Sequence, residues 1–156
     1  MAAPLLAGAS VATVGVLGAD GDKFRWPGPA MFCLTLAAIA LIASIQSAFR
    51  ARGYLYSPAE LRDWWEGEQA PSDGVLQQEQ RQDFERWMLW VNRAALVYNL
   101  GIVFLGCGVA GLLAPPDGAS EAHAGVRWLA AGAAVLATGW ELSSMSRQLL
   151  ARRRRR

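Results

Sequence analysis

The sequence predicts an all-α integral membrane protein, a four-helix bundle with a cytoplasmic helical extension. Its 156 residues are 53% hydrophobic and only 18% charged. The apolar residues gather in four runs, and three of them, residues 1–19, 28–49 and 94–114, contain no charged side chain. Each run approaches the ~20 residues that a helix needs to cross a bilayer. This composition excludes a soluble enzyme, a disordered chain and a disulfide-stapled secreted domain.

The four runs divide the chain into two hairpins and two cytoplasmic parts. Residues 1–49 form the first transmembrane hairpin, 50–93 a cytoplasmic helical segment, 94–146 the second hairpin and 147–156 a polybasic tail. The first run is also open to interpretation as a cleaved signal peptide. Residues 1–19 contain no basic side chain, so they lack the basic n-region expected of a signal peptide. A retained span is therefore favoured.

The positive charges predict the orientation of the hairpins. Only Lys23, Arg25 and Arg127 lie in the two short connections, whereas the other 12 basic residues lie in the middle segment and the tail. The positive-inside rule then places both termini in the cytoplasm, with Trp26 and Trp128 at the outer interface. The 14 Arg and single Lys, with 28 Ala, are typical of GC-rich codons and predict a bacterial cytoplasmic membrane.

The cytoplasmic segment is expected to hold two helices. Ser57-Pro58-Ala59-Glu60 is a capping box that predicts a short helix over residues 58–68. After a break at residues 70–74, the pattern predicts a continuous helix over residues 75–114 that rises into the membrane.

Both cytoplasmic helices carry aromatic and apolar side chains on one face. This partner face comprises Trp64, Trp65, Phe84, Trp87 and Met88. Either the two helices pack on each other and on the headgroups, or a cytosolic protein partner or a second copy covers the face. The segment holds 6 basic and 8 acidic residues, so no nucleic acid is indicated.

Small and amide side chains follow a heptad spacing in the third and fourth runs. Gly125, Gly132 and Gly139 repeat in the fourth, and its small surface predicts a helix inside a bundle. In the third, the members of the repeat share one face: Asn92, Asn99 and Gly106. This stripe predicts either an intrachain clamp to Ser44, Gln46 or Ser143, or a homo-oligomer contact that sets register or lines a polar path.

Charged residues near the membrane suggest structural roles. Glu141 is the one acidic residue inside a predicted span, and a structural ion pair with Arg50 or Arg93 is favoured over proton or ion handling. The tail is expected to bind the headgroups of anionic membrane lipids through Arg152, Arg153, Arg154, Arg155 and Arg156.

The sequence offers no constellation for site chemistry. Cys33, Cys107 and His123 are too few for a Cys/His zinc site, and no CxxC pair supports redox work. No Ser/His/Asp or His/Glu arrangement indicates an enzyme. We therefore expect no catalytic, cofactor-binding or metal site, and a chain that is not an enzyme.

Two short stretches resemble a set of small four-span membrane proteins of high-GC bacteria. They are Phe24-Arg25-Trp26-Pro27-Gly28 and Tyr54-Leu55-Tyr56-Ser57-Pro58. The resemblance covers about the first 65 residues and implies no activity, substrate or catalytic residue.

Three functions remain open. The aromatic helices, small helix faces and asparagine stripe favour a homo-oligomeric membrane effector or pore that responds to a cytoplasmic signal. The second is a non-enzymatic anchor or scaffold subunit for a cytosolic partner. A small solute transporter ranks third, because polar residues within the spans are few.

Overall fold

The computed structural model describes residues 2–54, 73–116 and 121–153, except the side chains of 73–77, 79, 122 and 144–153. These residues form four α-helices and one short 3-10 turn, with no strand among them. The helices are α1 (Ala3–Ala19), α2 (Pro27–Arg52), α4 (Asp73–Leu113) and α5 (Glu121–Arg153), and the turn η1 (Gly21–Lys23) joins α1 to α2. The all-α prediction is confirmed.

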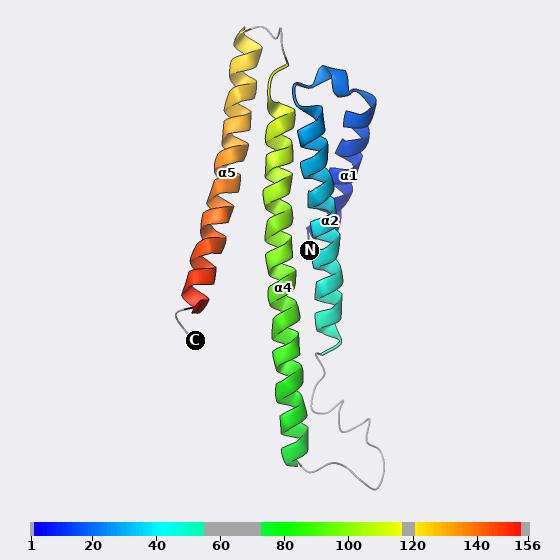
Figure 1. Ribbon diagram of the computed structural model, residues 1–156, viewed down its shortest axis with the longest axis vertical. Helices are drawn as coiled ribbons and strands as arrows, with labels where there is room; N and C mark the ends of the chain where they lie inside the picture. Colours follow the sequence, from blue (N-terminus) through cyan, green and yellow to red (C-terminus); the bar gives the residue numbers. More distant parts are fainter. Residues whose placement is uncertain (1, 55–72, 117–120, 154–156) are drawn as a thin grey trace.

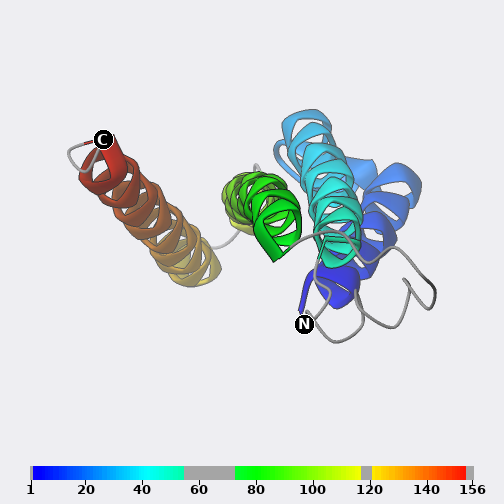
Figure 2. The same cartoon turned by 90° about the horizontal axis from the view of Figure 1, so that it is seen from below.

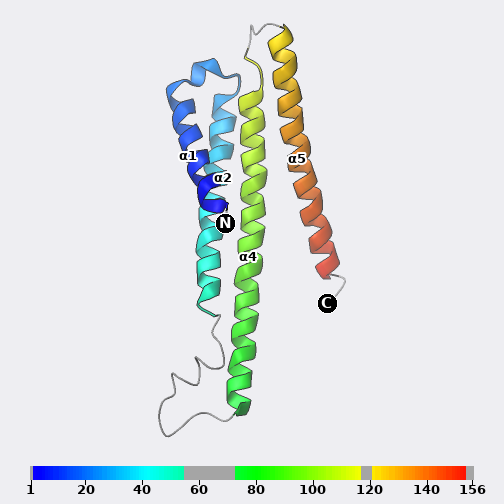
Figure 3. The same cartoon turned by 180° about the vertical axis from the view of Figure 1, so that it is seen from behind.

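The four helices lie side by side in an open row, in chain order (Figure 1). α2 packs between α1 and α4, and α5 contacts α4 at the far edge (Figure 2). α5 leans away from α4 toward its C-terminal end (Figure 3). Among the described helices α5 packs mainly on α4, and most of its described side chains are exposed. The expectation that the fourth helix lies inside a bundle, formed by one chain or by several, therefore stays a prediction.

Among the described residues, two helices are long and apolar enough to cross a membrane: α2 and the Gln80–Leu113 part of α4. α1 is apolar but only 17 residues long. α5 is 33 residues long, yet 11 of its residues are Ala or Gly and it includes the charged residues Arg127 and Glu141. The predicted continuous helix rising from the middle segment is present as α4, with 41 residues.

α2 and α4 meet along a seam of small residues. On α2 the buried positions follow a 3-4 spacing typical of coiled-coil packing: Ala30, Leu34, Ala37, Leu41, Ser44 and Ala51. On α4 the facing positions are Ala94, Gly101 and Gly108, seven residues apart. A Cβ on Gly101 would lie 3.0 Å from Leu41 Cγ, so glycine allows the two backbones to approach closely.

α1 covers the other side of α2 with the same spacing. Its buried residues are Ala3, Ala7, Ser10 and Leu17. Leu17 packs with Ala30 and Leu34 near one end, and Ala3 and Ala7 pack with Leu41 near the other. α2 extends beyond the first turn of α1, so the two helices end at different heights (Figure 1).

The buried hydroxyls in these helices are satisfied within the chain. Ser10, Ser47 and Thr138 each donate to the carbonyl oxygen four residues before, at 2.8 Å. The Ser44 Oγ donates to Ala94 O of α4 at 3.0 Å, a buried hydrogen bond between helices. These hydrogen bonds leave no buried side-chain polar atom unsatisfied in the described residues.

The seam generates a stability prediction. A Cβ on Gly108 would lie 2.7 Å from Leu34 Cγ, and Leu34 is 1% exposed and has no space to move into. We expect Gly108→Ala to lower the free energy of unfolding by about 1–3 kcal/mol through overpacking. Unfolding in mixed detergent micelles followed by circular dichroism measures this change.

The matched control is Gly132→Ala on α5, where an added Cβ meets nothing within 4 Å. It should be neutral or slightly stabilising, since alanine favours a helix by about 1 kcal/mol over glycine. Equal stability of Gly108→Ala and the wild type would contradict the close approach of α2 and α4.

Candidate functional site: an open α5 surface and a basic helix end

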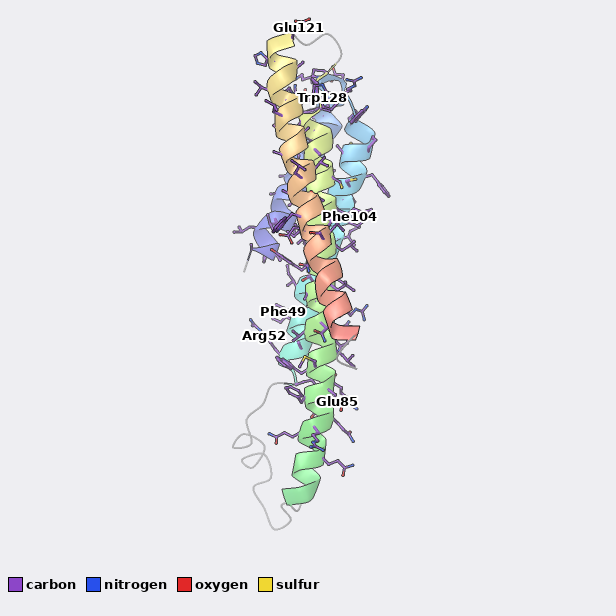
Figure 4. All side chains as sticks on the ribbon, turned by 90° about the vertical axis from the view of Figure 1, so that its left-hand side faces the viewer. Phe49, Arg52, Glu85, Phe104, Glu121 and Trp128 are labelled. Carbon is purple, nitrogen blue, oxygen red and sulfur yellow. The ribbon has the colours of Figure 1, made fainter. Side chains whose placement is uncertain are left out.

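α5 carries the sequence-predicted glycine stripe on a surface that no other described residue covers. A Cβ on Gly125, Gly132 or Gly139 would meet nothing within 4 Å. Exposed apolar side chains flank this stripe: Leu129 is 76% exposed, Val135 59% and Leu136 76%. Figure 4 shows α5 along its whole length, with Glu121 and Trp128 at one end. We call this surface the open α5 face.

The opposite side of α5 packs on α4. Ala131 and Thr138 are buried there, and a Cβ on Gly106 of α4 would overlap the Thr138 hydroxyl. Gly106 was expected to take part either in an intrachain clamp or in a contact between copies, and the structure gives it a close contact within one chain. Asn92 and Asn99 share the face of Gly106 and are half-buried.

The expected hydroxyl partners of the asparagine stripe are used elsewhere. Ser44 donates to Ala94 O, and Ser143 Oγ donates to Trp140 O at 2.8 Å. Gln46 is exposed on α2. Each hydroxyl therefore uses its one proton on a backbone carbonyl and could join the predicted clamp only as an acceptor.

The ion pair of Glu141 with Arg50 or Arg93 stays a prediction, and the structure gives both arginines another contact. Both guanidinium groups lie over the Trp90 ring, 5.1 Å and 5.4 Å from its centroid. Thr138 faces Gly106, and at 1.5 Å per residue in antiparallel helices this register separates Glu141 from Arg93 by about 15 Å along the helix axes.

The same register places Glu141 at an unexpected height. Glu141 lies level with residue 103 of α4, close to Gly101. Gly101 in turn faces Leu41 of α2, so Glu141 is at the height of the middle of α2 (Pro27–Arg52). Its side chain is exposed. If α2 spans, a carboxylate at this depth costs roughly 2.5–3.5 kcal/mol on insertion scales.

Arg127 links the start of α5 to the end of α4. Arg127 of α5 donates from Nε to Leu113 O at 3.3 Å and from Nη2 to Leu112 O at 3.1 Å. A cation at the C-terminal end of α4 also interacts favourably with its dipole. From the sequence, Arg127 counted only toward the topology. Its position six residues after the start of α5, beyond a short connection, was the available signal.

The two ends of the row carry aromatic side chains. Trp26 and Trp128 are each 47% exposed at the end where α1 joins α2 and α4 joins α5. At the other end, α4 continues past the last residue of α2 (Figure 1). There the Phe84 and Trp87 rings lie 5.5 Å apart, with Phe84 56% exposed and Met88 39% exposed.

Several predicted site residues lie outside what the structure describes. These are the helix over 58–68 with Trp64 and Trp65, and the side chains of Arg152, Arg153, Arg154, Arg155 and Arg156. Within the described residues, Cys33 and Cys107 are free thiols, and no group of three metal-ligating side chains occurs.

Comparisons with known proteins give no relative from which a function can be transferred. No family model, curated protein or solved structure matches this chain. The functional argument therefore depends on the chain's own geometry.

The contact of Arg127 with the end of α4 gives a second prediction. Arg127→Met keeps the apolar stem and removes both hydrogen bonds, so the free energy of unfolding should fall by about 1–2 kcal/mol. The matched control Arg81→Met alters an exposed arginine on the extension of α4 and should change it by at most about 0.5 kcal/mol. Equal effects of the two variants in micellar unfolding would refute the capping role.

Proposed function

We propose that this protein is a four-span membrane protein that forms a homo-oligomer through the open α5 face and acts as a non-enzymatic membrane effector or pore. The observation that carries the proposal is the contrast between the glycines of α4 and α5. Gly101, Gly106 and Gly108 each meet a neighbouring side chain within the chain, whereas Gly132 and Gly139 meet none. Helices in lipid gain from small residues only where another helix approaches closely.

The open row supports a head-to-tail arrangement of copies. α1 and α5 are its two edges (Figure 2), and α1 also carries uncovered glycines, Gly8 and Gly15. Successive helices alternate in direction, so α1 of one copy beside α5 of the next continues the alternation. The helix registers place Gly15 about level with the stretch of α5 between Gly132 and Gly139. Repeated contacts of this kind close into a ring when the rotation permits.

Within such a ring, polar residues at the middle of the spans would line a pathway or contact a neighbouring subunit. Glu141 lies near mid-height and Asn99 lies on the α4 face that also carries Gly106. Polar side chains at this depth are costly in lipid and are typical of pathways or contacts between subunits. This arrangement favours a pore or gated effector over a simple anchor.

A specific observation favours a second function, that of an anchor or scaffold for a cytosolic partner. From the level of the last turn of α2 onward, α4 exposes Phe84, Met88 and Leu89, the last of them 67% exposed. Exposed apolar side chains on a projecting helix fit a groove in a partner protein. A stoichiometric complex with a cytosolic protein, in place of a homo-oligomer, would favour this function.

The proposed topology has both termini and residues 50–93 in the cytoplasm. Single cysteines at Ser72, Ser120 and the C-terminus, on a background lacking Cys33 and Cys107, test it with a membrane-impermeant thiol reagent on intact cells. Only the cysteine at position 120 should react, because it lies between α4 and α5 at the proposed outer end. Labelling at position 72 would contradict the orientation.

The head-to-tail contact predicts that both edges of the row are needed. Gly132→Leu and Gly15→Leu should each reduce the assembled fraction at least tenfold, since leucine bulk separates closely packed helices. Native mass spectrometry from mild detergents measures the assembled fraction. The matched control is Ala137→Leu, an exposed residue on another side of α5, which should assemble as the wild type does.

The two leucine variants distinguish a head-to-tail contact from a symmetric one. Loss with Gly132→Leu but not with Gly15→Leu would replace the head-to-tail contact by a symmetric contact between α5 helices. A folded wild type that stays monomeric in several mild detergents would overturn the oligomer and leave the anchor as the better account.

A further inference from the structure

A cavity of about 440 Å³ lies beneath the N-terminal end of α1. Ala3 and Pro4 of α1 border one side, Ala48 and Phe49 of α2 another, and Tyr98 of α4 a third. The cavity exists because α1 is shorter than α2. Ala3 packs near Leu41 and Ile45, and α2 continues for seven more residues, about 10 Å of helix, past Ile45.

The walls of the cavity are apolar and one guanidinium stands at its end. Ser44 also borders it, but its hydroxyl is already bonded to Ala94 O. Arg52 borders the cavity at the last residue of α2, and its guanidinium lies 5.5 Å from the Phe49 ring centroid. Figure 4 shows Phe49 and Arg52 together on the part of α2 that runs on toward the Glu85 end of α4. No acidic side chain is among the described lining residues.

We propose that this cavity binds one acyl chain of an anionic phospholipid, with the lipid phosphate held by Arg52. The volume is in the range of built small-molecule sites, and an apolar chamber with a single cation at its mouth complements an apolar chain with a single anion at its head. Arg50, two residues away, lies over Trp90 instead, so the two arginines at this helix end have different neighbours.

The inference rests on the membrane placement proposed above, and it does not require the oligomer. In that placement the Arg52 end of α2 lies in the cytoplasmic leaflet, where anionic lipids and a negative surface potential favour a phosphate beside a basic side chain. The site differs from the polybasic tail because it has a cavity for the chain as well as a charge for the headgroup.

The test is native mass spectrometry of the full chain taken from membranes containing equal phosphatidylglycerol and phosphatidylcholine. The wild type should retain phosphatidylglycerol in preference to phosphatidylcholine. Arg52→Gln should reduce that preference roughly fivefold, whereas its matched control, Arg50→Gln, should keep it. Equal losses in both variants would mean that the basic helix end attracts lipid in general, which would overturn the proposal.

A second pair of variants tests the cavity. Ala48→Leu fills it and should reduce retention of both lipids at least fivefold. Ala95→Leu places the same bulk on an exposed part of α4 at the same height and should retain lipid as the wild type does. Retention by Ala48→Leu equal to that of the wild type would overturn the proposal, and helix content by circular dichroism verifies that each variant is folded.

These outcomes separate the lipid site from the proposed function. If the protein requires detergent for extraction but retains both lipids equally, the lipid site is contradicted and the membrane placement is supported. If the protein is released without detergent, both the lipid site and the membrane placement are contradicted. The masses in the same spectra report the oligomer independently.

Discussion

The close approach of α2 and α4 is the constraint on which the rest of the structure depends. Ala94, Gly101 and Gly108 remove side-chain bulk at seven-residue intervals, and leucines of α2 fill the space. If both helices span a membrane, as proposed, the hydrophobic effect contributes little between them, and van der Waals contact along this seam then provides the association energy. The Ser44 hydrogen bond to Ala94 O sets the register of this seam. α1 and α5 then add to a pair that is already fixed.

The sequence predicted the helices well and their arrangement poorly. Uncharged runs and a continuous apolar face identify α2 and α4 without tertiary information, because length and periodicity are local properties. Small residues predict that a helix packs closely but not against which neighbour. The repeat through Gly101 and Gly108 forms the main seam, whereas the repeat through Gly132 and Gly139 stays uncovered. Both repeats look alike in the sequence.

The heights of the charged residues depend on register for a related reason. From the sequence, Glu141, Arg50 and Arg93 were expected at the same inner level. The contact of Gly106 with Thr138 sets a register that places Glu141 near mid-height, and Trp90 provides both arginines with a π face instead. A register between helices depends on side-chain shape along the whole contact, so it cannot be read from either helix alone.

Unequal helix lengths give the two ends of the molecule different properties. At the end with Trp26 and Trp128, short connections and the Arg127 hydrogen bonds hold neighbouring helices together. At the other end α1 stops first, α2 stops at Arg52, and of the described helices α4 continues furthest. The cavity and the exposed Phe84 and Met88 lie near these helix ends. Where one helix ends before its neighbour, apolar surface stays exposed that helices of equal length would bury. The surfaces available for lipid, a second copy or a cytosolic partner therefore follow from where each helix ends, because the seam between α2 and α4 leaves no freedom to shift the helices and cover them.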